Sequence, residues 1–187
     1  MDRSALLTEL GVLVTPFPYE IHPDFPPEGL TFEERWRSAP AAGEAIYTRV
    51  EAECEAVGLP FRRPARIPNT RRALETAAYV RQEAPDAFPA LDRSLFDAHF
   101  VDGRFLGDQE VLDELVAAAG ADPLEVRRAV DAGEMAEGVD SSMIVAREIG
   151  IDGTPTWLID GRTLVPGVHP RDHYRTVVGD PPPVSRT

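Results

Sequence analysis

The sequence contains no lysine, so all of its basic residues are arginine. A mechanism that needs a lysine Schiff base, or the lysine of a phosphate-binding P-loop, is therefore excluded. The patterns G-x-G-x-x-G and G-x-S-x-G are absent too, so a dinucleotide-binding turn and a hydrolase nucleophile elbow lack their motifs.

Basic residues are also few relative to acidic ones. The chain has 19 arginines against 32 aspartates and glutamates, a formal net charge of -13. A surface this negative repels nucleic-acid phosphates and anionic lipid, so we expect no nucleic-acid partner and no membrane partner. With 187 residues, 43% hydrophobic and 27% charged, the chain can bury a core of its own.

Cysteine occurs once, at Cys54. Within these 187 residues this excludes an intramolecular disulfide, a C-x-x-C pair and a thiolate zinc site. Cys54 shares a helical stripe with Ile46, Val50 and Val57, so we expect its side chain to face a core, where burial raises the thiol pKa. We predict no catalytic residue in this chain and no metal site.

The N-terminal segment has a short apolar stretch that Thr8 and Glu9 interrupt. It lacks a basic region and a small-residue cleavage site, so it does not have the pattern of a signal peptide. We therefore expect a cytoplasmic protein.

The order of elements is strand, helical block, hairpin and helix. After a short helix that includes Leu6 to Leu10, residues 12–21 form a β-rich run in which Pro16 and Pro18 favour an edge or irregular strand. Residues 31–149 are helical in pattern, and Asp160-Gly161 predicts a hairpin turn. We expect an α/β domain, with a sheet portion from residues 1–30 and 150–180, a helical insertion at 31–149 and a disordered tail at 181–187.

Several segments resemble one known family, in order along the chain. GIDGTPTWLIDGR resembles the cis-proline loop and hairpin of thioredoxin-fold proteins, and FPYEIHPDFPPEG resembles the second core strand and loop of the DsbA family. The segments NTRRALETAAYV, SLFDAHFVDGRFLGD and VLDELVAAAGAD resemble the helical insertion of its FrnE-like branch. The resemblance implies a thioredoxin-like (DsbA-like) sheet with an all-helical insertion.

The resemblance places Thr154-Pro155 at the cis-proline position. It implies that Gly153, Thr154 and Pro155 bind substrate, either an extended peptide or a thiol, without a cofactor. The chemistry agrees, because the main-chain N–H and C=O of a residue before a strand-opening proline can pair with an extended chain.

The cysteine pair of that family is not in this sequence. DsbA-like enzymes carry C-x-x-C between the first strand and the first helix, and only about twenty residues precede the proline-rich loop here, whereas a βαβ unit needs about 30. We therefore infer that the first strand of the fold is missing from this sequence. We favour a gene start placed too far downstream over a naturally shortened relative, because loss of an interior strand leaves backbone groups unbonded.

The leading hypothesis is a DsbA-family thiol-disulfide oxidoreductase-like protein whose catalytic cysteine pair is absent from this chain, which alone should be inactive. One alternative is a glutathione-binding enzyme resembling kappa-class transferases and hydroxychromene carboxylate isomerases. Another is a non-catalytic thioredoxin-fold binding module, in which a homodimer could cover the gap.

Overall fold

The computed structural model describes residues 2–179, so the tail predicted at 181–187 lies outside the described residues. Contacts divide the chain into two compact units. One comprises Met1–Phe17 and Val145–Thr187, and the other comprises Pro18–Ile144. Each unit has an apolar core of its own.

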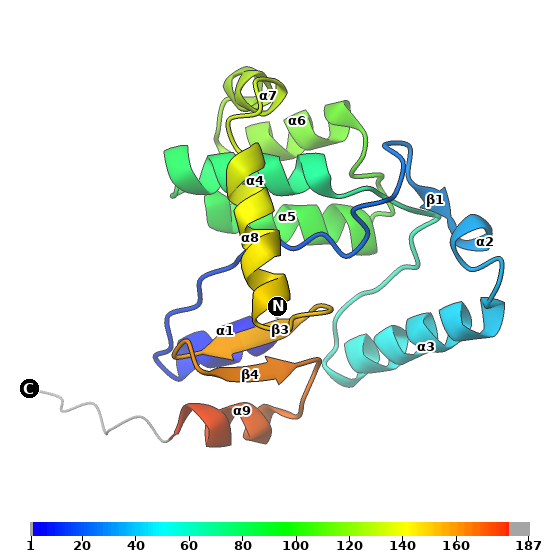
Figure 1. Ribbon diagram of the computed structural model, residues 1–187, viewed down its shortest axis with the longest axis vertical. Helices are drawn as coiled ribbons and strands as arrows, with labels where there is room; N and C mark the ends of the chain where they lie inside the picture. Colours follow the sequence, from blue (N-terminus) through cyan, green and yellow to red (C-terminus); the bar gives the residue numbers. More distant parts are fainter. Residues whose placement is uncertain (1, 180–187) are drawn as a thin grey trace, which may run out of the picture. The chain divides into compact units, whose positions relative to one another are not determined.

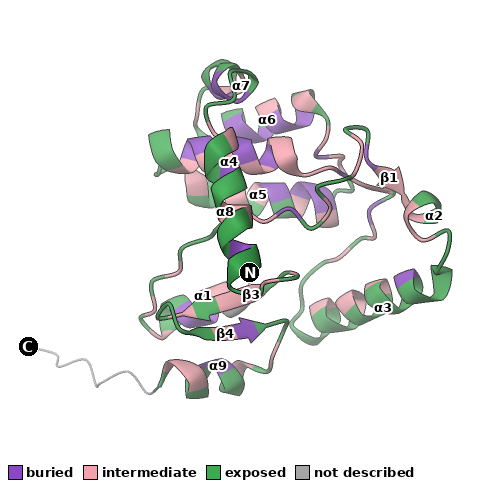
Figure 2. Ribbon diagram, in the orientation of Figure 1, coloured by how far each residue is buried: buried purple, intermediate pink, exposed green. Residues whose placement is uncertain are grey.

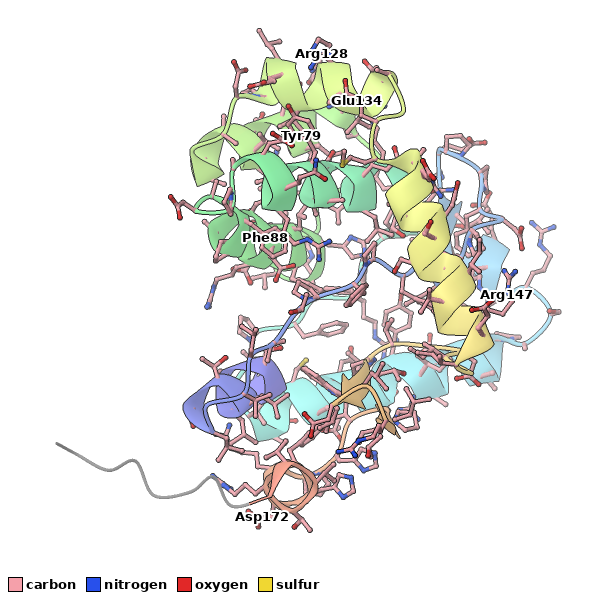
Figure 3. All side chains as sticks on the ribbon, turned by 60° about the vertical axis from the view of Figure 1, so that its left-hand side comes forward. Tyr79, Phe88, Arg128, Glu134, Arg147 and Asp172 are labelled. Atoms are coloured by element: carbon pink, nitrogen blue, oxygen red, sulfur yellow. The ribbon has the colours of Figure 1, made fainter. Side chains whose placement is uncertain are left out.

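The core of the larger unit lies among four helices (Figure 1), namely α4 (Arg71–Glu83), α5 (Phe88–Phe100), α6 (Gln109–Ala119) and α7 (Pro123–Asp131). Their apolar stripes supply the fully buried Val80, Leu91, Leu112 and Val116. Tyr79 projects from α4 into this core (Figure 3). Burying such side chains contributes about 1.5–3 kcal/mol each, so this core carries much of the unit's stability.

Side-chain caps fix where the helices begin. The Asp108 carboxylate accepts a hydrogen bond from the N–H of Glu110, and the Asp122 carboxylate accepts bonds from Leu124 and Glu125. These interactions satisfy N–H groups that have no partner inside the helix. Gly120, with φ of 93°, ends α6 in the left-handed conformation that glycine adopts without strain.

Three short elements structure the N-terminal part of this unit. Strands β1 (Leu30–Thr31) and β2 (Arg66–Ile67) pair antiparallel, and Thr31 caps the four-residue helix α2 (Phe32–Arg35). The Thr31 hydroxyl accepts from the Glu34 N–H, and the Glu34 carboxylate accepts from the Thr31 N–H. These two hydrogen bonds form a capping box, which fixes the start of α2.

The following helix, α3 (Pro40–Ala56), corrects one prediction. Ile46 and Val57, expected in the core with Cys54, are 41% and 37% exposed, and Gly43 is the buried residue of the helix. Figure 2 shows exposed residues along most of α3. The helix instead contacts its unit through Tyr47, whose ring centroid lies 5.8 Å from that of Phe32 and 6.5 Å from that of Phe61. The helix face that periodicity predicted to be buried is therefore the wrong one.

Helix α8 (Ala136–Glu148) begins in the larger unit and ends in the smaller one. The smaller unit also contains α1 (Asp2–Glu9), the strands β3 (Thr156–Ile159) and β4 (Thr163–Pro166), and α9 (Arg171–Val178). Its core joins Leu6 and Leu7 of α1 to Val165 of β4 and Tyr174 of α9, and Figure 1 shows α9 alongside β4.

The predicted hairpin is confirmed. Strands β3 and β4 pair antiparallel with Trp157 opposite Val165, and Asp160 and Gly161 turn the chain with φ of 52° and 67°. Two consecutive positive φ values match the twist of the flanking strands. The Arg162 N–H donates to the Ile159 carbonyl at 3.0 Å and closes the turn.

The strand expected over residues 12–21 is not formed. Val12 and Val14 pack on the core of the smaller unit while Leu13 is 91% exposed, so the alternation of a strand is present. No strand of residues 2–179 pairs with this run. Pro16 and Pro18 also lack the N–H that a ladder needs.

Among residues 2–179, no helix has both the length and the apolar character needed to cross a membrane.

Candidate functional site

The candidate site lies where α8 ends and β3 begins, within the smaller unit. Gly150 has φ of 81°, and the Ile151 N–H returns to the Ala146 carbonyl at 2.8 Å, which ends α8. A left-handed glycine at this position satisfies carbonyls that the helix leaves open. The chain then runs directly into Gly153, Thr154 and Pro155.

Gly153, Thr154 and Pro155 form a short loop held by two hydrogen bonds. The Thr156 hydroxyl donates to the Gly153 carbonyl, and the Gly167 N–H donates to the Pro155 carbonyl, each at 2.7 Å. The Thr154–Pro155 peptide bond is cis. The two hydrogen bonds hold the residues on both sides of this peptide bond against the hairpin, so the loop is preformed.

Thr154 itself is exposed, and within residues 2–179 neither its main-chain N–H nor its C=O forms a hydrogen bond. A free donor and acceptor on one exposed residue can pair with the main chain of an extended partner. The three residues that the sequence singled out therefore form one loop, in which Thr154 offers a free main-chain donor and acceptor.

The sequence did not identify the residues that support this loop. Tyr174 is fully buried, packs its ring edge-on against Trp157 at 5.9 Å, and donates from its hydroxyl to the Gly167 carbonyl at 3.3 Å. Gly167 thus links Tyr174 to Pro155. The register of the hairpin could have identified Gly167, because pairing Thr156 with Pro166 places Pro155 opposite Gly167.

The one cysteine has the character of an inert thiol. Cys54 lies on α3, partly exposed, and burial together with the charge of Glu53 raises its pKa above the usual value. Because the thiolate is the reactive form, a raised pKa disfavours nucleophilic chemistry at ordinary pH.

The histidine pair forms no metal site in the part of the chain that the structure describes. His169 and His173 stack with ring centroids 4.4 Å apart, and His169 Nε2 lies 2.9 Å from the Pro166 carbonyl oxygen. No group of three or more histidine, cysteine, aspartate or glutamate residues among residues 2–179 could hold a metal ion.

A separate hollow of about 270 Å³ lies in the larger unit. It is bounded by Tyr79, the ends of α4 and α6, and the start of α7, with Glu83, Asp122 and Glu125 on its wall. Burial, followed by the charge of Glu125, raises the pKa of Tyr79, so its phenol stays neutral.

Comparison with known proteins decides the family. The family model described as DSBA-like thioredoxin domain matches residues 5–178. The chain belongs to this family. The α/β, DSBA-like thioredoxin fold predicted from the sequence is thereby confirmed.

This DSBA-like chain is similar to the crystal structure of a probable DsbA oxidoreductase from Streptomyces coelicolor. The TM-score is 0.81 at 21% sequence identity, and the alignment covers 94% of this chain and 81% of that chain. At this identity the likeness establishes the fold. No curated protein matches the sequence.

Proposed function

We propose that this DSBA-like chain, as a member of the FrnE-like branch, docks an extended peptide or thiol substrate of thiol–disulfide exchange at Gly153, Thr154 and Pro155. The observation that carries the proposal is the exposed Thr154, whose main-chain N–H and C=O have no hydrogen-bond partner within residues 2–179. Family membership supports an oxidoreductase-like role for the fold.

This sequence contains the proposed docking loop but not the two cysteines that thiol–disulfide exchange needs. Exchange begins when a thiolate attacks a disulfide sulfur, and release of the mixed disulfide needs a second thiol. These 187 residues hold one cysteine, whose pKa is raised. The chain by itself therefore supplies docking without a dithiol.

A titration of the ¹⁵N-labelled chain tests the docking. The probes are an eight-residue peptide with one central cysteine, its serine counterpart, and glutathione. Both peptides should shift the amide signals of Gly153, Thr154 and Thr156. Absence of shifts there overturns the proposal, and a response to glutathione without one to the peptides favours the glutathione-binding alternative.

Two variants of Thr154 separate main-chain from side-chain binding. Thr154→Pro removes the N–H and should weaken peptide binding about fivefold, the effect of one hydrogen bond of about 1 kcal/mol. Thr154→Ala keeps both main-chain groups and should bind like the parent chain. Equal loss in both variants contradicts main-chain docking.

A further inference from the structure

We propose that one face of α3 binds the same face of a second copy of this chain, with the two helices antiparallel. This α3 outer face consists of Ala42, Ala45, Ile46, Arg49, Glu53, Ala56 and the C-cap residue Val57. It belongs to the larger unit, whereas the loop of residues 153–155 belongs to the smaller one. The inference therefore goes beyond the proposed function and does not depend on it.

The α3 outer face lies on one side of the helix. At 3.6 residues per turn, its seven residues fall within an arc of about 120°. Gly43 and Tyr47, which contact the rest of the unit, lie outside this arc. All seven residues of the outer face are exposed, as Figure 2 shows for most of α3.

The composition of this face is unusual for a helix surface in water. Five of its seven residues are alanine, isoleucine or valine, and Ile46 and Val57 are 41% and 37% exposed. The solvent side of a surface helix normally carries polar and charged side chains. Contiguous exposed apolar residues are typical of a protein–protein contact.

The two charged residues of the face carry opposite signs. Arg49 and Glu53 lie about one turn apart, and neither forms an ion pair with another residue of 2–179. Within one helix, a basic residue four positions before an acidic one is the weaker order for pairing. Each charge is therefore available to a partner.

An antiparallel pairing makes the face complementary to itself. With a two-fold axis level with residue 51, Arg49 lies level with Glu53 of the second copy. The same register sets Ile46 level with Ala56 of the second copy, and Ala45 level with Val57 of the second copy. Each charge then meets its opposite, and each large apolar side chain meets an alanine. Two-fold symmetry makes every contact occur twice.

The size of the contact sets its strength. Alanine favours close approach of the two helix axes, toward the lower end of the usual distance of about 8–10 Å. Helix α3 has 17 residues and is therefore about 25 Å long. A single helix-to-helix contact of this length is smaller than a standard interface, so we expect weak and reversible association.

Charge favours this arrangement over two others. A parallel pair would set Arg49 level with Arg49 and Glu53 level with Glu53, and like charges at a contact are destabilising. An anionic lipid surface is disfavoured by the net charge of -13. That net charge also repels a second copy, but charges more than about 8 Å apart are largely screened at physiological ionic strength.

Sedimentation equilibrium of the 187-residue chain tests the association. The buffer holds about 0.15 M salt, and dithiothreitol prevents disulfide-linked dimers through Cys54. Protein concentrations from about 10 µM to about 1 mM span weak affinities. The apparent mass should rise with concentration from that of one chain toward that of two. The mass of one chain at every concentration overturns the inference.

Charge reversals test the register. Arg49→Glu and Glu53→Arg each set like charges opposite each other and should weaken association about tenfold, because symmetry applies each change twice. An equimolar mixture of these two variants restores opposite charges at both contacts and should associate like the parent chain. Glu55→Arg makes the same charge change as Glu53→Arg at an exposed position outside the outer face, and it should leave association unchanged.

These variants also give the results that contradict the pairing. Equal weakening by Glu53→Arg and Glu55→Arg, or a mixture that stays monomeric, overturns α3 as the interface in this register. NMR of the ¹⁵N-labelled parent chain decides without any variant. The amide signals of Ala45, Ile46 and Ala56 should shift as protein concentration rises, and concentration-dependent shifts that occur only outside α3 overturn the inference.

Discussion

The guanidinium of Arg71 lies 3.1 Å from the carboxylate of Glu20, although 51 residues separate them in the sequence. The same guanidinium donates to Glu75 at 2.6 Å, to Asp140 at 2.5 Å and to the Ala136 carbonyl at 2.9 Å. Arg71 therefore fastens the segment that contains Glu20, the start of α4 and the start of α8 within the larger unit.

Replacing this arginine should destabilise the unit strongly. Arg71→Leu leaves Glu20 and Glu75, both buried, without their cation, and breaking a buried pair in this way costs about 3–5 kcal/mol. We expect a loss near the lower bound, since Arg71 is itself 27% exposed. Urea unfolding of parent and variant measures it.

Arg63→Leu is the matched control. Arg63 also bonds two carboxylates, Glu44 and Glu51, but their side chains are 56% and 43% exposed. Pairs this exposed contribute about 0–1 kcal/mol. A loss in Arg63→Leu as large as in Arg71→Leu would show that burial of the partners is not what matters.

A second prediction concerns the contact between α3 and Trp36. A Cβ atom added to Gly43 would lie 2.5 Å from Cγ of the Trp36 ring. Gly43→Ala must therefore displace the indole, at a cost of about 1–3 kcal/mol from overpacking. Gly138→Ala on α8 has open space around the added atom and should gain up to about 1 kcal/mol. In thermal unfolding, the melting temperature should fall for Gly43→Ala and rise for Gly138→Ala.

The third prediction concerns acid stability. Burial lowers the pKa of His99 below 6.5, against the opposing effect of its hydrogen bond with the Arg104 carbonyl. As the pH falls, His99 is therefore protonated at a higher pH in the unfolded chain than in the folded protein. As pH falls below about 6.5, protonation favours the unfolded state, so the free energy of unfolding decreases until the folded pKa is passed.

His99→Phe should therefore reduce the fall in unfolding free energy between pH 7 and pH 5. Part of it should remain, because burial and the nearby Arg35 also lower the pKa of His22. His173→Phe, at an exposed position of α9, serves as the control. An unchanged pH dependence in His99→Phe contradicts the assignment. Urea titrations at three pH values measure it.

The fourth prediction is a negative result in a redox assay. The 187-residue chain should not accelerate the reduction of insulin by dithiothreitol, because its one thiol has a raised pKa and no second cysteine is present to complete exchange. Cys54→Ser is the control. Faster insulin reduction with the parent chain than with that variant would reveal a reactive thiol and contradict the claim that this chain by itself lacks redox activity.

Local rules predicted those features whose cause is local. Asp160-Gly161 turns the hairpin as predicted, and the helix caps at Asp108, Asp122 and the Thr31–Glu34 box follow the same kind of local rule. Each depends on a side chain or glycine within a few residues of the backbone it serves. The assignment of substrate docking to Gly153, Thr154 and Pro155 stays a prediction.

Features that depend on distant partners were not predicted. Periodicity put Ile46 and Val57 in a core, but it could not show that α3 contacts its unit through Tyr47. Alternation suggested a strand at residues 12–21, yet a ladder needs a neighbour, and residues 2–179 provide none. The ion-pair cluster at Arg71 joins residues far apart in sequence, so neither composition nor spacing indicates it.

Pro166 limits the growth of any assembly through this hairpin. Because Pro166 has no N–H, the outward edge of β4 lacks a main-chain donor that an uninterrupted strand would have. Repeated edge-to-edge addition, which leads to fibres, needs both edges of each molecule. The β4 edge of the hairpin is therefore a weak template for such addition.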